Sequence, residues 1–510
     1  MSGSLSIAMK KLIFLIIYLL NSSSLSAQLN RGAVWCFGDS AGIDFNSSPP
    51  QPISSGMDCR GSCASISDSS GNLAFYVSTG NHNLYNSGYF KAGIVWNRNN
   101  EKMENGDSLE GGMWYYEMAI VPNPANLQQY YVIHIGILHN PGLYYSLVDL
   151  SYNSGLGKVL QKNVLISNFN GQSPVDGLAI IKHGNGRDWW IFSKTYGSLT
   201  TNNIHRFLIT DTGISTGTIQ NIGTATYAGI LRLKFNAAGN KLVIVCASGL
   251  LELYDFDRCS GLLSNRIQIN WETGLRQDYF WDAEFSPNSS KLYVSVMDTL
   301  SMLIQYDLSA TNISSTRQTL FTFNFPVYGA GNLKLAPDQK IYWSIGYDDG
   351  IFFNYPYPDS IRNLYNENLS VINQPDLLGA ACNFLPYSFY LGGKRTYIGL
   401  PNNPDYDLPA LGGSVCDSLG LPNVVVGVSG GGDEITIFPN PASNKLNVFF
   451  NKNDGEIVTA KIIDLYGRMV LKQNLQNNSI NLENLSAGSY VISFYENNSY
   501  LSNTRFTIVK

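Results

Sequence analysis

Four acidic residues open or precede apolar stretches and are the groups best placed for acid–base chemistry: Glu117, Asp176, Asp282 and Glu284. A glycoside hydrolase needs two carboxyl groups that face each other across its site, one to protonate the leaving oxygen and one to act as base or nucleophile. The alternative role is structural. An acid before an apolar strand often accepts hydrogen bonds from the backbone N–H groups of a neighbouring turn.

Histidine offers little further chemistry in this chain. His82, His134, His139, His183 and His205 lie in separate parts of the sequence. We expect a buried structural histidine at His134, inside an apolar run, and a turn residue at His183. No CxxC pair is present and no histidine lies close to a cysteine in the sequence, so we predict neither a metal nor a cofactor. The sequence also lacks an HExxH helix, a P-loop and an EF-hand loop.

Aromatic side chains on expected loops form a second candidate site, a binding face for a sugar or a peptide. Aromatic rings offer large contact areas with polar tips. The alternative is β-sheet packing, which also enriches tyrosine. The candidate face consists of Trp114, Tyr115, Trp271, Trp281 and Tyr347, and Tyr116, Tyr279 and Phe280 stand beside them in the sequence.

Length and composition limit the class of protein. The chain has 510 residues, so two or more domains are expected. Only 14% of the residues are charged, while 48 are glycine and 31 are tyrosine, which favours an extracellular β-protein. The net charge is −5 and there is no basic block, so we predict no nucleic-acid partner.

The first residues have the pattern of a secretory signal peptide. Two lysines, Lys10 and Lys11, precede an apolar run from Leu12 to Leu20, and a small-residue region ends at Ala27. We therefore predict a cleaved signal peptide over residues 1–27, with a retained membrane anchor as the alternative. No other stretch is long and apolar enough for a transmembrane helix.

Seven cysteines follow the signal peptide, so we expect disulfides in an oxidising compartment. Cys59/Cys63, Cys246/Cys259 and Cys382/Cys416 are the candidate pairs, and Cys36 is the seventh cysteine. The connectivity stays open, because spacing alone does not fix it.

Six segments share one pattern: a short strand, a polar turn rich in Pro, Asn, Asp or Gly, and a second strand rich in Tyr, Val, Ile and Trp. They are Cys63–Val77, Met118–Ile133, Leu178–Phe192, Leu231–Val245, Asp282–Val296 and Asn332–Ile345. A period of roughly fifty residues without helical periodicity predicts an all-β fold of propeller blades. An array of β-sandwiches is the alternative.

The ends of the repeat region predict how the ring closes. Ala33–Phe45 reads as a strand without a hairpin partner of its own, and Phe389–Asn402 has the same character. We expect the two to meet in a composite seventh blade. A six-bladed propeller is the alternative, because residues 46–61 are irregular.

The sequence changes character after the propeller, which we predict over residues 28–410. Residues 411–433 contain a glycine run and predict a flexible linker. Residues 434–510 contain short alternating strands and turn residues, which predict a small immunoglobulin-like β-sandwich without a cysteine.

Three motifs in this last segment resemble the C-terminal sorting domain of type IX secretion cargo, the Por secretion tail. They are "FPNPASNKLNV" from Phe438, "KIIDLYGRMV" from Lys461 and "LSAGSYVISF" from Leu485. The resemblance implies that the type IX machinery recognises this domain after Sec export. The matching residues are Pro439, Asn440, Pro441, Asp464, Gly467, Arg468, Gly488, Tyr490 and the terminal Lys510.

The repeat region resembles, less specifically, the WD-repeat-like propellers of gliding-motility-associated surface proteins. "WCFGDSAGIDF" from Trp35, "KHGNGRDWWIF" from Lys182 and "GKRTYIGLPN" from Gly393 carry this resemblance. It implies a propeller at the outer cell surface, and it does not imply a role in gliding.

We therefore expect a secreted or cell-surface binding or adhesion protein that is not an enzyme. Its propeller would bind an unknown surface protein or glycan, and its tail would direct export. The alternative is a propeller polysaccharide hydrolase exported by the same route.

Overall fold

The chain folds into two compact units. The computed structural model describes residues 30–417, apart from 81–92, 113, 138–139, 197–201, 226–229, 272–278, 298–300, 324–326 and 348–360. It also describes residue 419 and residues 435–508, apart from 440–441, 451–457, 465–468, 476–478, 487 and 497–498. The predicted signal peptide and most of the predicted linker lie outside the described residues. Within the described part, no helix is long and apolar enough to cross a membrane.

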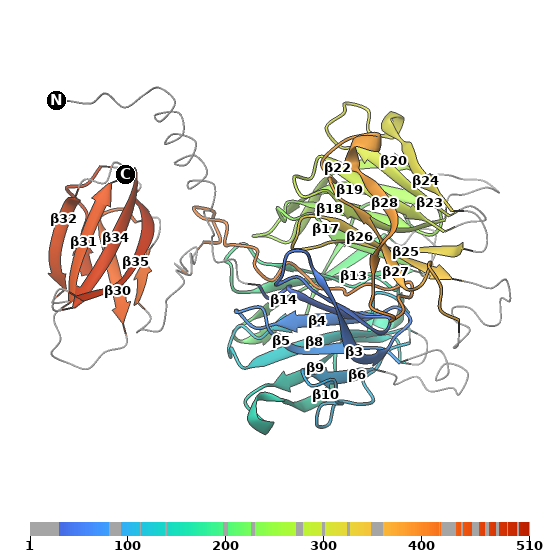
Figure 1. Cartoon of the computed structure of the whole chain (residues 1–510), viewed down its shortest axis with the longest axis horizontal. Coiled ribbons are helices and arrows are strands. Elements are labelled where there is room, and N and C mark those ends of the chain that lie inside the picture. The colour runs from blue at the N-terminus through green and yellow to red at the C-terminus, as the bar shows by residue number, and fades with distance from the viewer. Residues whose placement is uncertain are drawn as a thin grey trace, which may run out of the picture. The chain divides into compact units, whose positions relative to one another are not determined.

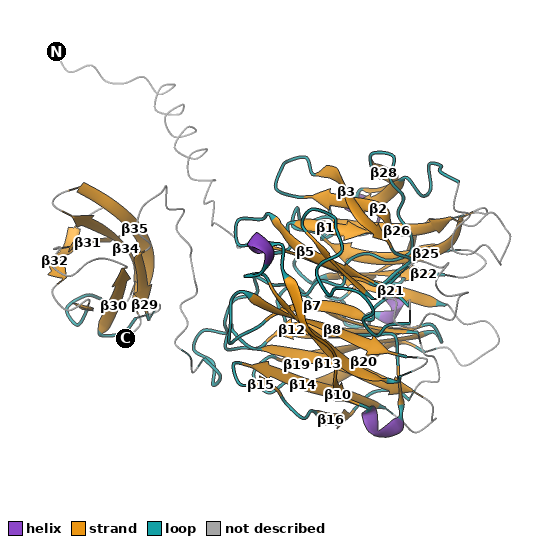
Figure 2. Cartoon of the chain, turned by 90° about the horizontal axis from the view of Figure 1, so that it is seen from below, coloured by secondary structure: helices purple, strands orange, loops and turns teal. Residues whose placement is uncertain are grey.

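The described part of the large unit, Asn30–Asp417, contains seven small antiparallel sheets (Figures 1 and 2). The predicted all-β class is confirmed. The first three sheets contain β1 (Val34–Phe37), β2 (Asp39–Asp44) and β3 (Gln51–Asp58); β4 (Cys63–Ser67), β5 (Leu73–Ser78) and β6 (Ile94–Asn97); and β7 (Met118–Pro122), β8 (Gln129–Gly136), β9 (Gly142–Asp149) and β10 (Lys158–Ser167).

The other four sheets follow in chain order. The fourth contains β11 (Ser173–Pro174), β12 (Ala179–Lys182), β13 (Trp189–Tyr196), β14 (Asn203–Thr210), β15 (Gly213–Ile214) and β16 (Thr218–Asn221). The fifth contains β17 (Leu231–Phe235), β18 (Lys241–Cys246), β19 (Leu250–Asp257) and β20 (Leu262–Asn270). The last two contain β21 (Phe280–Phe285), β22 (Lys291–Val296), β23 (Met302–Asp307) and β24 (Gln318–Thr322); and β25 (Val327–Leu335), β26 (Ile341–Tyr347), β27 (Asn368–Ile372) and β28 (Phe384–Tyr390). Short 3₁₀ turns occur at Asn153–Gly155, Phe169–Gly171, Ser314–Thr316 and Gly379–Cys382.

Each of the six predicted hairpins forms, as β4–β5, β7–β8, β12–β13, β17–β18, β21–β22 and β25–β26. The turn between β17 and β18 shows why. The side-chain oxygen of Asn236 accepts hydrogen bonds from the backbone N–H groups of Asn240 and Lys241, each at 2.9 Å. Gly239 has a φ of +68°, which glycine adopts without strain. Local turn chemistry therefore fixes each repeat.

The first strands of successive sheets pack against one another, as β4 does with β7, β17 with β21, and β21 with β25. Their apolar residues form the shared cores. One core holds Leu231 and Leu233 of β17, and the next holds Ala283 and Phe285 of β21. The inner strands thus surround the centre of the large unit.

The first sheet corrects one prediction. Val34–Phe37 does have a hairpin partner of its own, because β1 pairs antiparallel with β2 in the register Val34 to Asp44 and Phe37 to Ala41. The glycine at Gly38, with a φ of +62°, allows this tight reversal. Backbone pairing between the two expected ends is limited, among the described residues, to a single bridge between Asp39 and Arg395, although Leu391 and Leu400 also share a core with Val34 and Phe37. Arg395 Nη2 lies 2.7 Å from Asp39 Oδ2 there.

Residues 396–417, which we call the strap, run across the inner strands after this bridge. Asn402 Nδ2 donates to the carbonyl oxygens of Met118 and Leu178 at 3.2 and 2.9 Å. The strap also packs tightly against the backbone at Gly61. A Cβ atom at Gly399 would lie 1.9 Å from the carbonyl oxygen of Gly61, so only glycine fits there. Residues 411–417, expected in the linker, belong to the large unit.

One disulfide, Cys259–Cys416, joins the strap to the turn after β19, with a Cα–Cα distance of 5.4 Å. The candidate pairs Cys246/Cys259 and Cys382/Cys416 are therefore wrong. The strap carries Cys416 to Cys259 because Leu411 N–H donates to the carbonyl oxygen of Gly184, in the neighbouring turn, at 2.7 Å. Cys59 and Cys63 are both buried and form no disulfide, so this candidate pair is wrong as well. Cys36, Cys246 and Cys382 are also buried and outside any disulfide.

The described part of the small unit contains seven strands in two sheets. One sheet has the order β29-β30-β33 and the other β32-β31-β34-β35. Their apolar side chains form one core that includes Val448, Ile462, Ile492 and Phe506. The strands are β29 (Ile435–Phe438), β30 (Lys445–Phe450), β31 (Val458–Asp464), β32 (Met469–Leu475), β33 (Ser479–Asn481), β34 (Gly488–Glu496) and β35 (Ser499–Ile508).

We expect loss of the strap disulfide to destabilise the large unit. Cys259 and Cys416 are 157 residues apart, so the bond lowers the entropy of the unfolded state, which stabilises the fold by about 5 kcal/mol on the loop-closure estimate. Cys259→Ser and Cys416→Ser should each lower the thermal midpoint of the large unit in calorimetry. The double variant should lose no more than either single variant, since all three lack the same bond. Additive losses would show that the two cysteines act separately.

Candidate functional site

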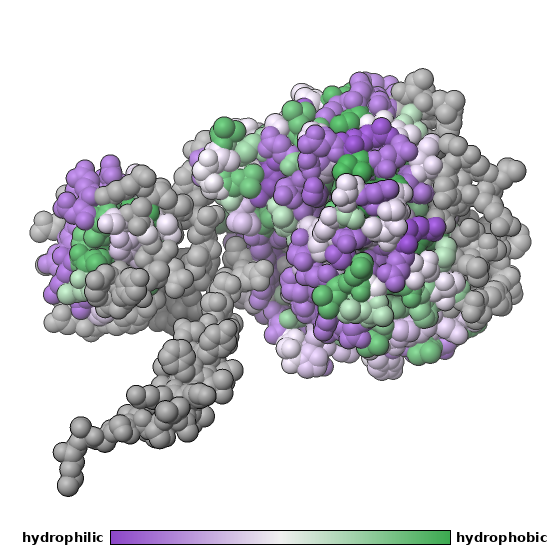
Figure 3. All heavy atoms as spheres, turned by 90° about the horizontal axis from the view of Figure 1, so that it is seen from above, coloured by the Kyte–Doolittle hydropathy of each residue, from purple (hydrophilic) through white to green (hydrophobic). Residues whose placement is uncertain are grey.

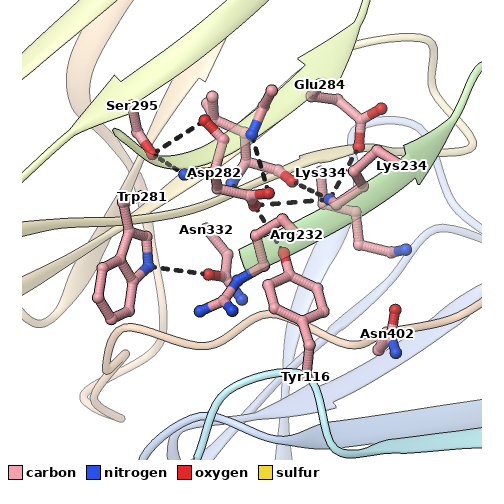
Figure 4. A network of polar contacts seen from close by, with 12 residues as sticks. Tyr116, Arg232, Lys234, Trp281, Asp282, Glu284, Ser295, Asn332, Lys334 and Asn402 are labelled. Atoms are coloured by element: carbon pink, nitrogen blue, oxygen red, sulfur yellow. Dashed lines mark hydrogen bonds and ion pairs between the residues drawn. The ribbon is translucent and has the colours of Figure 1, made fainter. Parts of the chain in front are cut away.

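The four predicted acids come from three adjoining regions, and each is held by backbone N–H groups. Asp282 and Glu284 lie on β21 and face β25 (Figure 4). Asp282 Oδ2 accepts from the N–H of Leu333 at 2.9 Å, and Glu284 Oε2 accepts from the N–H of Leu335 at 3.2 Å. The first strand of one sheet thereby satisfies the backbone of the next.

Asp176 and Glu117 do the same at the turn that precedes β7. Asp176 accepts from the N–H groups of Tyr115 and Tyr116 at 3.0 and 2.6 Å. Glu117 accepts from the N–H groups of Gly112 and Trp114 at 2.8 and 3.0 Å. These bonds match the structural role that the sequence analysis gave as the alternative for the acids. They also occupy carboxylate oxygen atoms that a catalytic acid or base would need for its substrate.

Tyr116 crosses the centre of the large unit. Its hydroxyl group donates to Asp282 Oδ2 at 2.6 Å, although the two residues are 166 positions apart (Figure 4). Burial, together with the negative charge of Asp282, raises the pKa of Tyr116 well above its ordinary value. Tyr116 therefore stays protonated and links the third sheet to the sixth.

Three cations complete the centre, and the sequence motifs did not predict them. Arg232 Nη1 lies 3.2 Å from Asp176 Oδ2, and Lys234 Nζ lies 3.5 Å from Asp282 and 3.4 Å from Glu284. Lys334 Nζ donates to the carbonyl oxygen of Asn403 in the strap at 3.2 Å. The sequence does contain a pattern that could have predicted them. Charged residues alternate with apolar ones in "LRLKF" and "FWDAEF", so the two charged residues of each strand project from the same face.

Burial and neighbouring charges shift these groups in different directions. Burial lowers the pKa of Lys234, but the charges of Asp282 and Glu284 outweigh it, so that the pKa lies above its usual range. The pKa of Lys334 falls to about 8, first through burial and then through the charge of Lys234. Burial, followed by the charge of Asp176, raises the pKa of Glu117 well above its usual range. The centre is thus a compact network in which charges are largely neutralised by partners.

The five predicted aromatic residues divide among three places. Tyr115 and Trp281 are buried together, with ring centroids 4.5 Å apart, and Trp114 packs beside them while partly exposed. Trp271 packs against the core of the fourth and fifth sheets, and Tyr347 stacks on Tyr365 at 5.9 Å. The structure therefore unites three of the five. Their contact with a ligand stays a prediction.

The surface of the large unit is mixed in character on the face that Figure 3 shows. On the face seen in Figure 3, apolar side chains occur in small groups among hydrophilic ones. Scattered apolar residues of this kind are normal on soluble proteins. The described residues also contain no group of three His, Cys, Asp or Glu side chains placed to hold a metal ion.

His134 and His183 both form hydrogen bonds within the fold, as expected for histidines with a structural role. His134 is buried, with Nε2 3.1 Å from Ser146 Oγ, and burial lowers its pKa to about 3. His183 Nδ1 accepts from the N–H of Asn185 within its turn. His82 and His139 lie outside the described residues.

The sorting-motif residues are only partly described. Pro439 follows β29, Asp464 ends β31, and Gly488 begins β34. Tyr490 is buried, and its hydroxyl group donates to the carbonyl oxygen of Ser486 at 2.8 Å. Asn440, Pro441, Gly467, Arg468 and Lys510 lie outside the described residues.

Comparison with known families identifies the small unit. Residues 436–510 match the family described as the secretion system C-terminal sorting domain. This match indicates export of the chain by type IX secretion and engagement with its machinery, which is consistent with a secreted or surface location. No curated protein matches the sequence.

Solved structures similar to this chain are distant. A putative 6-phosphogluconolactonase from Bacteroides fragilis is 12% identical, with a TM-score of 0.44 over 74% of this chain and 98% of its own. The periplasmic gluconolactonase of Pseudomonas aeruginosa is 9% identical, with a TM-score of 0.40 over 72% and 98%. The β-propeller domain of Swd1 from Myceliophteria thermophila is 10% identical, with a TM-score of 0.36 over 62% and 94%. Such low scores carry no argument about activity.

We expect Asp282→Asn to destabilise the large unit strongly. The substitution removes the charge that Lys234 faces and disturbs the acceptor of Tyr116 and Leu333, and breaking a buried ion pair in this way costs about 3–5 kcal/mol. The matched control is Asp255→Asn, which breaks the more exposed pair with Lys241 and should cost about 1 kcal/mol or less. Chemical denaturation of both variants gives the comparison. Equal losses would contradict the structural role of Asp282.

Proposed function

We propose that the chain is a secreted, non-enzymatic binding or adhesion protein of the outer cell surface. Its large unit would be a seven-bladed β-propeller, and its small unit an immunoglobulin-like sorting domain that leads it through type IX secretion. The sorting-domain match over residues 436–510 is the observation that carries the export part of the proposal.

The central acids support a binding role over a hydrolytic one. Each of Glu117, Asp176, Asp282 and Glu284 accepts at least two backbone N–H groups. A pair of glycosidase carboxyl groups must instead exchange protons with the substrate or attack it. Acids engaged in holding inner strands together are poorly suited to that task.

Delivery and ligand binding are assigned to different parts of the chain. The large unit has stabilising ion pairs of its own, such as those of Arg232 with Asp176 and Arg395 with Asp39. The disulfide at Cys416 fastens the end of the strap before residues 418–433 begin. Removal of the small unit after export would therefore leave the proposed ligand-binding unit complete, and we include this removal in the proposal.

Deletion of residues 434–510 should stop surface export while the signal peptide still directs the chain to the periplasm. Cell fractionation, together with protease treatment of intact cells, would locate the truncated chain. A reporter protein that carries residues 1–27 at its start and 418–510 at its end is the converse test and should reach the surface. Normal surface export of the truncated chain would refute the sorting role.

Ligand binding should depend on the partly exposed ring of Trp114. We expect the purified protein to bind a component of a glycan and surface-protein array, and Trp114→Ala to weaken that binding by tenfold or more. Trp96→Ala is the control, because Trp96 stacks on Tyr76 away from the centre. A hydrolase panel run on the same samples tests the alternative: sustained turnover of a polysaccharide that Asp282→Asn abolishes in folded protein would favour the hydrolase.

A further inference from the structure

Four buried nitrogen atoms near the centre of the large unit carry N–H groups that contact no hydrogen-bond acceptor among the described residues. They are Nε and Nη2 of Arg232, Nδ2 of Asn332 and Nε1 of Trp114. Buried donors without an acceptor are rare, and each costs about 1–3 kcal/mol. All four atoms are donors, so the group that would satisfy them must supply oxygen atoms.

These donors belong to one cluster of side chains. Trp281 Nε1 donates to Asn332 Oδ1 at 3.2 Å, which directs the amide nitrogen of Asn332 elsewhere. Figure 4 shows the Arg232 guanidinium group beside the Asn332 side chain. Trp114 packs on Tyr115, whose ring contacts that of Trp281. The donors therefore come from β17, from β25 and from the turn before β7, and the side chain that carries each contacts Tyr115 or Trp281.

The two edges of Arg232 have different environments. Nη1 donates to the carbonyl oxygen of Asp176 at 2.6 Å and to that of Leu231 at 3.1 Å, and it pairs with the Asp176 carboxylate. Nε and Nη2 form the opposite edge. Two parallel N–H groups of this kind match the two oxygen atoms of a carboxylate.

Aromatic rings surround the same guanidinium group. The Arg232 Cζ atom lies 5.7 Å from the ring centre of Tyr115, 4.4 Å from that of Tyr116 and 5.2 Å from that of Trp281. Rings next to a cation suit a ligand that combines a charged group with a flat apolar face. A sugar acid has both, because its ring presents C–H groups on one face and carries a carboxylate at its edge.

Two lysines lie near the unpaired donors, in a network whose charges are already paired. Lys234 and Lys334 lie close enough that the charge of Lys234 lowers the pKa of Lys334. The acids in the network, Asp176, Asp282 and Glu284, already hold cations and backbone donors. An added carboxylate would therefore meet the unpaired donors, with Lys234 and Lys334 nearby and the acids already engaged.

We propose that Nε and Nη2 of Arg232, with Nδ2 of Asn332, bind the carboxylate of an acidic sugar. This inference rests on the proposed binding function and names the ligand class of that site. The Arg232 side chain is only 1% exposed, so the ring cluster must open to admit the ligand. Trp114, the partly exposed ring, is the one that moves, and association is slow for that reason.

Calorimetric titration of the full chain with trimers of galacturonic, glucuronic and mannuronic acid tests the proposal. At least one trimer should bind, and its methyl ester, which lacks the charge, should bind tenfold more weakly or worse. Arg232→Lys keeps the charge but loses the forked edge, and it should weaken binding of the acid by at least tenfold.

Asn332→Asp provides a second variant in case Arg232→Lys fails to fold. It keeps the oxygen that accepts from Trp281 but replaces the donor with a negative charge, so acid binding should again fall by at least tenfold. Asn126→Asp, in an exposed turn, is the matched control and should change nothing.

Each other outcome overturns the proposal. Equal binding of acid and ester, or unchanged binding by folded Asn332→Asp, would show that the carboxylate is not recognised here. Binding of an acidic peptide in place of every uronate trimer would assign the donors to another ligand. If only neutral glycans bind, in a manner sensitive to Trp114→Ala, the proposed binding function stands and this inference fails.

Discussion

Hydrogen bonds from backbone N–H groups to buried carboxylates are the interactions on which the large unit depends. The first strand of each sheet pairs on one side only, so its other edge carries unsatisfied backbone groups. A sheet exposed to water would bond them to solvent, but the centre of this unit is buried. Asp282 and Glu284 accept from the free edge of β25, and Asp176 accepts from the turn before β7. The carboxylates thus accept the hydrogen bonds that a neighbouring strand would otherwise accept.

This arrangement constrains every other charge at the centre. A buried carboxylate needs a cation, and Arg232 and Lys234 supply it from β17, the strand between the sheets that the acids join. The cations have aromatic or carbonyl neighbours in turn. Arg232 lies over the ring of Tyr116, and Lys334 donates to a carbonyl oxygen of the strap. A ligand that entered here would therefore contact the same side chains that hold the sheets together, and binding would be coupled to stability.

The sequence allowed the repeating part of the fold to be predicted, because each hairpin is encoded by its own turn. Asn236 and Gly239 fix one such turn without help from distant residues. The closure was predicted less well, since it depends on Asp39 meeting Arg395 and Cys259 meeting Cys416 across long separations. The acids were found as candidates from their positions. Their hydrogen-bond partners could not be predicted. The packing of two sheets decides which backbone N–H group lies opposite Asp282, and no local sequence pattern records that packing.

The contact between Asp39 and Arg395 has a consequence for how the chain is made. The two residues are 356 positions apart, so at about 5–20 residues per second the ribosome needs roughly 20 to 70 s to produce the second after the first. Until then the first sheet lacks its last neighbour, and the inner strands cannot enclose the centre. The chain therefore lacks this contact during most of its synthesis. Whatever must act on the chain before this contact forms has that interval in which to do so.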